Sequence, residues 1–184
     1  MAAKKTNPTW TDVKAKLVHF DQDDLLGLLQ NLYAANKDNQ IFLHARFNLG
    51  GDVLKPYKAT INRWLWPDIL KNQDYSVAKA KKAISDYKKA IGQAEGLAEL
   101  MVYYCECVTG FSNNVGIEDE SYLDALVQMF EQTLKTATAL PETQRDPLWT
   151  RLDAVRRVSH DNLGYGVSED MDDLLAEYRV VGRL

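Results

Sequence analysis

Three histidines are the side chains of this sequence best suited to bind a metal or transfer a proton, and they lie far apart. None of His19, His44 and His160 has a second histidine three or four residues away, the spacing that places two ligands on one helix face. His44 and Arg46 together could contact an anion, and His160 lies at an expected helix end, where a cationic ring interacts favourably with the helix dipole. We interpret each histidine as a structural or surface residue.

The chain contains only two cysteines, Cys105 and Cys107. Two residues apart on a helix, their side chains point about 200° away from each other, which disfavours a disulfide. A zinc site would need a second pair of ligands, and the spacing offers none. We expect buried free thiols, which fits a reducing cytoplasm.

Two acidic clusters could bind a hard cation, but neither has the spacing of a calcium loop. Both fall at expected helix starts, where the helix dipole favours acids. Glycine turns at 50–51 and 164–166 are interpreted as helix ends rather than phosphate loops, so we predict no metal and no cofactor. The cluster residues are Asp21, Asp23, Asp24, Glu169, Asp170, Asp172 and Asp173.

One basic helix face is the only candidate binding surface that stands out. Residues 76–91 carry an apolar stripe at alternating spacings of three and four, and a Lys-Lys-Ala-Ile motif occurs twice, seven residues apart. Asp86 lies within one turn of two of the lysines and partly neutralises them. A solvated face is the plain interpretation; a site for an acidic partner or nucleic acid is the alternative. The face consists of Lys81, Lys82, Lys88 and Lys89.

Amphipathic helices must position all these residues, because apolar spacings of three and four recur along the chain. The helix at 76–91 is followed by a break near Gly92 and a second arm at 93–108, which predicts a hairpin; one kinked helix is the alternative. Polar connections are predicted at 36–39 and 109–116. The other predicted helices cover 9–18, 21–35, 41–48, 52–66, 119–139, 146–163 (with Pro147 at its first position) and 168–178 (capped by Ser168).

The fold class is predicted to be all-α, since no stretch keeps the period-two alternation of a strand. We expect one compact domain at 9–184, preceded by a mobile arm at 1–8. It should contain about seven to nine helices packed as antiparallel hairpins, with a solenoid-like stack as a variant. The residues expected in the core include Ile84 and Met101 and, on the helix at 21–35, Leu25, Leu28, Leu29, Leu32 and Tyr33; Trp66 rather than Trp64 is expected to be partly exposed.

The composition and charge of the chain argue against nucleic-acid binding, secretion and membrane insertion. The chain has 184 residues, 46% of them hydrophobic, and a formal net charge of −4, so the whole molecule is not typical of nucleic-acid binders. The first residues lack the apolar core of a signal peptide, and no run approaches the ~18 apolar residues of a bilayer span. We therefore expect a cytoplasmic protein without membrane contact.

Four stretches together resemble a known family: 42–47, 80–92, 95–104 and 163–166, the last followed by an acidic helix start. The resemblance is to a bacterial family of mainly helical proteins known only as a domain of unknown function. It implies a bacterial source and a single helical domain, and it supplies no catalytic residue, cofactor or substrate.

Three hypotheses for function remain. The first is a non-enzymatic helical protein-interaction module, self-associating or binding another protein. The second is binding of nucleic acid or an acidic partner through the lysine face. The third is an enzyme whose site is assembled from residues distant in sequence.

Overall fold

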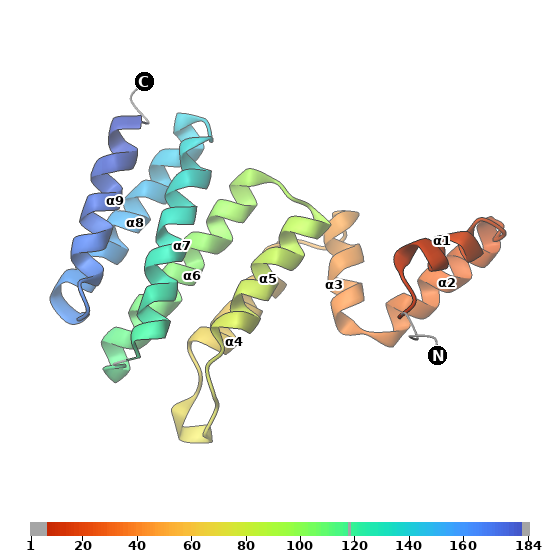
Figure 1. Ribbon diagram of the computed structural model, residues 1–184, viewed down its shortest axis with the longest axis horizontal. Helices are drawn as coiled ribbons and strands as arrows, with labels where there is room; N and C mark the ends of the chain where they lie inside the picture. Colours follow the sequence, from red (N-terminus) through yellow and green to blue (C-terminus); the bar gives the residue numbers. More distant parts are fainter. Residues whose placement is uncertain (1–6, 118, 182–184) are drawn as a thin grey trace, which may run out of the picture. The chain divides into compact units, whose positions relative to one another are not determined.

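The computed structural model describes residues 7–117 and 119–181, which form nine α-helices, one short 3₁₀ helix and no strand (Figure 1). The predicted all-α class is confirmed. Contacts divide the chain into two units, residues 1–43 and residues 44–184. The division lies inside the range predicted as one domain, 9–184, and that prediction stays a prediction. Of the predicted mobile arm, residues 1–6 lie outside the described residues.

The N-terminal unit contains two helices and the start of a third: α1 (Trp10–Leu17), α2 (Gln22–Ala35) and α3 (Lys37–Arg46), which runs on into the second unit. At the start of α2, Asp21 accepts a hydrogen bond from Asp24 N at 2.8 Å, and Asp24 accepts one from Asp21 N at 3.3 Å. These reciprocal bonds satisfy amides that lack partners within the helix. The first acidic cluster is therefore a helix cap, as predicted.

The corner between α2 and α3 is closed by amide side chains. Asn36 Oδ1 accepts from Asp38 N at 2.7 Å, so α3 begins at Lys37 and the predicted turn at 36–39 is wrong beyond its first residue. Asn39 Nδ2 donates to Leu32 O at 2.7 Å, which occupies a carbonyl at the end of α2.

The second unit is a stack of three antiparallel helix pairs, α4 with α5, α6 with α7, and α8 with α9 (Figure 1). Within it α4 packs on α6, α6 on α8, and α7 on α9. Each pair thus contacts mainly its neighbours, which is the organisation of a helical solenoid. The elements are α4 (Lys55–Leu65), the 3₁₀ helix η1 (Ile69–Lys71), α5 (Val77–Ala90), α6 (Ala94–Val115), α7 (Glu120–Thr138), α8 (Glu142–Asn162) and α9 (Val167–Val181).

A glycine separates α5 from α6. Gly92 has φ +71°, and the amides of Ile91 and Gly92 both donate to Tyr87 O, at 2.9 and 3.3 Å. This left-handed closure ends α5, because a side chain at that φ would be strained. The predicted hairpin is confirmed and the single kinked helix is excluded.

Several further predicted boundaries are wrong, among them the start of α4, which lies at Lys55 and not at residue 52. The range 109–116 continues α6 to Val115, because Thr109 and Ser112 are buried in the core instead of lining a polar connection. Helix α8 begins at Glu142, not at Pro147: the amides of residues 144 and 145 both donate to Pro141 O at 2.9 Å and complete a turn before the proline. The last helix begins one residue before Ser168, which is therefore not its cap.

The core is centred on α6, most of whose side chains are buried between α4, α5, α7 and α8. Ile84 and Met101 are buried, as predicted. Tyr122 on α7 is also buried and donates its hydroxyl to Leu65 O at 2.7 Å, which caps the end of α4 across the stack. None of the described helices is both long and apolar enough to cross a membrane.

Candidate functional site

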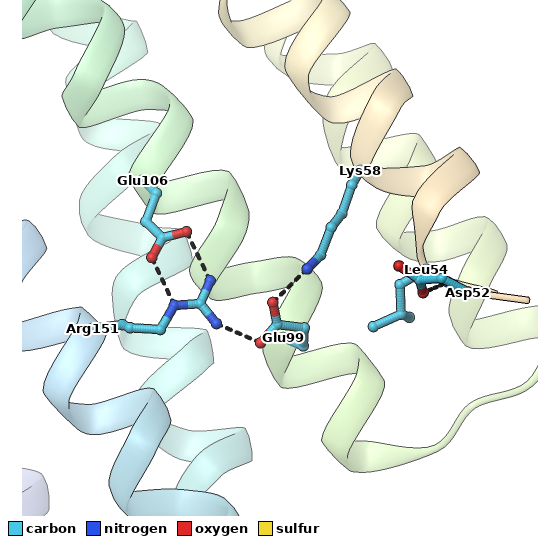
Figure 2. A network of polar contacts seen from close by, with 6 residues as sticks. All are labelled: Asp52, Leu54, Lys58, Glu99, Glu106 and Arg151. Atoms are coloured by element: carbon cyan, nitrogen blue, oxygen red, sulfur yellow. Dashed lines mark hydrogen bonds and ion pairs between the residues drawn. The ribbon is translucent and has the colours of Figure 1, made fainter.

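A polar network joins α4, α6 and α8 on one side of the stack (Figure 2). Glu99 on α6 accepts from Lys58 Nζ at 2.6 Å and from Arg151 Nη1 at 2.5 Å. Arg151 on α8 also binds Glu106 with both remaining nitrogens, Nε and Nη2, at 2.7 Å each. Two cations and two carboxylates are thus paired in a part-buried position, with side chains between 22% and 35% exposed.

The hydrogen bonds of the network favour the charged forms of Glu99 and Arg151. Burial acts to raise the pKa of Glu99, but the hydrogen bonds from Lys58 and Arg151 outweigh it, and the pKa is lowered. The pKa of Arg151 is raised, first by its hydrogen bonds to Glu106. Because both carboxylates are engaged by cations, neither is poised to act as a general base. The arrangement ties three helices together.

Tyr103 lies beside this network. The Lys58 ammonium sits 5.3 Å from the centre of its ring, a cation–π contact. Burial and the neighbouring Cys107 and Glu106 raise the pKa of Tyr103 to about 12, so the phenol is neutral at physiological pH. It adds a half-buried aromatic surface to the network and no titratable group near neutrality.

Sequence reasoning missed the network. Glu99 and Glu106 are seven residues apart and so share a helix face, and this was the available signal. Their partners, Lys58 and Arg151, lie more than forty residues away in sequence, and nothing local links them to α6.

The thiols are inert. Cys105 and Cys107 are both free and buried, as predicted. Burial raises the pKa of Cys107 to about 12 and that of Cys105 further still, so neither forms a thiolate under physiological conditions. Among the described residues, no cluster of three or more His, Cys, Asp or Glu side chains could hold a metal ion.

The four lysines of the predicted basic face all lie on α5, but they differ in environment. Lys82 Nζ pairs with Asp86 at 2.5 Å, and Lys81 Nζ donates to Gln128 Oε1 of α7 at 3.4 Å. Lys88 and Lys89 are exposed near the end of the helix. The binding role assigned to this face stays a prediction.

The exposed apolar side chains within residues 7–43 are the most unusual feature of the described chain. No side chain of residues 7–43 is buried. The prediction that α2 buries one face is wrong: of its five expected core residues, four are exposed and Leu28 is half-buried. A hairpin this short has no interior of its own in which to bury them. The large apolar side chains exposed here are Trp10, Val13, Val18, Phe20, Leu25, Leu26, Leu29, Leu32, Tyr33 and Phe42.

A second, smaller apolar surface is the tip of the loop between α4 and α5. Asp68 holds the tip by accepting from Leu70 N at 3.2 Å and pairing with Lys71 Nζ at 2.8 Å. This leaves Leu70 92% exposed. Trp66 at the base of the loop is exposed, as predicted.

Comparison with protein families, with curated proteins and with solved structures gives no match. The candidate surfaces are therefore judged on their chemistry and geometry alone.

Proposed function

We propose that this protein is a non-enzymatic protein-interaction module that binds through the exposed apolar face of α1 and α2, hereafter the hairpin face. The observation that carries the proposal is the absence of any buried side chain in residues 7–43, combined with nine large exposed apolar side chains on α1, on α2 or between them. Monomeric soluble proteins rarely expose contiguous apolar patches beyond roughly 300–600 Å².

The area of the hairpin face matches that of a protein interface. The nine side chains are between 37% and 71% exposed. With about 100–200 Å² per fully exposed side chain of this size, they leave on the order of 700 Å² of apolar surface. A standard interface takes about 800 Å² from each partner. Covering this face would also stabilise α1 and α2, because helices this short are marginal in water without packing.

Charge favours a protein over a membrane or nucleic acid as the partner. Residues 1–43 contain five aspartates and five lysines, so their side chains carry no net positive charge. Binding to the phosphates of anionic lipids or nucleic acids usually relies on such a charge. An apolar face without net charge suits a folded protein with an apolar groove and a polar rim.

Compartment and origin are part of the same proposal. Two buried, unpaired thiols support a reducing compartment such as the cytoplasm. The resemblance of four sequence stretches supports membership of the bacterial helical family of unknown function.

Affinity purification of the tagged full-length chain from its own cells tests the proposal. Leu26→Glu with Leu29→Glu places two charges on the hairpin face, and Gln30→Glu with Asn31→Glu places the same charges on the polar side of α2. The partner captured by the wild type is either another protein or an untagged copy of the chain. We expect the polar-side variant to retain this partner and the hairpin-face variant to lose it. Equal retention by both variants, at unchanged helicity, would contradict the proposal.

A further inference from the structure

We propose that the partner on the hairpin face is a second copy of this chain, with α2 packed antiparallel against α2 of that copy. The inference rests on the proposed function and specifies its partner. It starts from the apolar residues of α2, which at 3.6 residues per turn occupy an arc about 160° wide. Leu29 lies near the middle of this arc in both angle and sequence, and Gln30 lies on the polar side.

The arc is self-complementary about Leu29. In a two-fold antiparallel pair centred there, residues equally far from Leu29 on either side face each other. Leu25 then lies opposite Tyr33 of the second copy. Leu26 lies opposite Leu32. All five side chains are exposed in the single chain, between 37% and 56%, and each meets an apolar side chain in the pair.

The distribution of charge along α2 matches the same pairing. Asp21 caps its first turn, where Asp23 and Asp24 also lie, and its last turn carries no acidic or basic residue. Antiparallel packing places the acidic start of one α2 beside the uncharged last turn of the other. The two helix dipoles then also oppose each other. A parallel pair would instead bring the aspartates of the two copies together.

Site-specific disulfide formation tests the pairing in the full-length chain. A cysteine at the two-fold axis meets its own copy, so Leu29→Cys should form an interchain disulfide under mild oxidation. Gln30→Cys, about 100° around the helix, is the matched control. The native thiols are at most 3% exposed and do not compete. We expect Leu29→Cys to cross-link at least tenfold faster than Gln30→Cys.

Sedimentation velocity supplies a second readout. The wild type should sediment as a dimer at micromolar concentration, and Leu29→Glu as a monomer with unchanged α-helix content in the second unit. A wild type that stays monomeric up to 100-fold higher concentration, or equal cross-linking at the two positions, would overturn the pairing. A monomer that still captures another protein through the hairpin face would overturn only this inference, whereas loss of all capture would overturn the proposed function as well.

Discussion

Replacing Glu99 by Gln should destabilise the helix stack by about 1–2.5 kcal/mol. The substitution keeps the size of the side chain but removes the charge that pairs Lys58 on α4 with Arg151 on α8. Arg151 retains its two bonds to Glu106, so the main loss falls on the ion pair with Lys58, whose ammonium also contacts the Tyr103 ring.

The magnitude follows from the contacts. A hydrogen bond to a charged group contributes roughly 1.5–3 kcal/mol when desolvated, and exposed pairs contribute about 0–1 kcal/mol. Glu99 and Lys58 are 22% and 28% exposed, which places the pair between these limits. For a chain of this length each kcal/mol lowers Tm by roughly 2–4 °C, so we expect a decrease of about 2–10 °C.

The pH dependence of the stability difference tests the role of the Glu99 charge more directly. The pKa of Glu99 is lower in the folded than in the unfolded chain. Its contribution is therefore fully present above the unfolded pKa of about 4.3 and is lost as the pH falls through the folded value. In urea unfolding, the wild type should have a larger free energy of unfolding than Glu99→Gln at pH 7, and this difference should shrink at pH 3. The reasoning would be refuted if this difference in unfolding free energy were the same at both pH values. It would also be refuted if the difference were no larger than the effect of Glu131→Gln at an exposed position of α7.

Three further predictions concern the core and the lysine face. Tyr122→Phe removes the donor to Leu65 O and should cost about 1–2 kcal/mol in urea unfolding, because a buried carbonyl loses its partner; a neutral result would mean that water replaces the hydroxyl. Met101→Ala should cost about 2–4 kcal/mol through the cavity it leaves, while an effect below 0.5 kcal/mol would place this side chain outside the core. Duplex DNA should bind weakly or not at all near physiological salt. A binding constant that falls with salt concentration with a log–log slope of about −3 to −4 would instead support the lysine face as a nucleic-acid site. That slope should then disappear when four residues are changed to Glu: Lys81, Lys82, Lys88 and Lys89.

Local signals in the sequence predicted local structure well. The reciprocal caps at Asp21, the break at Gly92 and the burial of Ile84 and Met101 each depend on residues within a few positions of one another. Helix starts were less predictable: the turn closed on Pro141 O starts α8 at Glu142, so Pro147 lies inside the helix and not at its first position.

Features that depend on the partner of a helix face were not predictable. The apolar spacing of α2 correctly indicates an amphipathic helix, but spacing does not say whether the apolar face meets the same chain or another molecule. In the same way, Glu99 alone gives no sign of Lys58 and Arg151, since the three are brought together only by the stacking of α4, α6 and α8.

Photo-cross-linking in living cells tests most directly the claim that the hairpin face binds a protein. A benzophenone side chain would replace Leu29 in one strain and Gln30, on the polar side of the same helix, in another. We expect irradiation to give one discrete protein adduct from position 29, at twice the mass of the chain if the partner is a second copy, and little or none from position 30. No adduct at position 29, or the same adducts at both positions, would contradict the account.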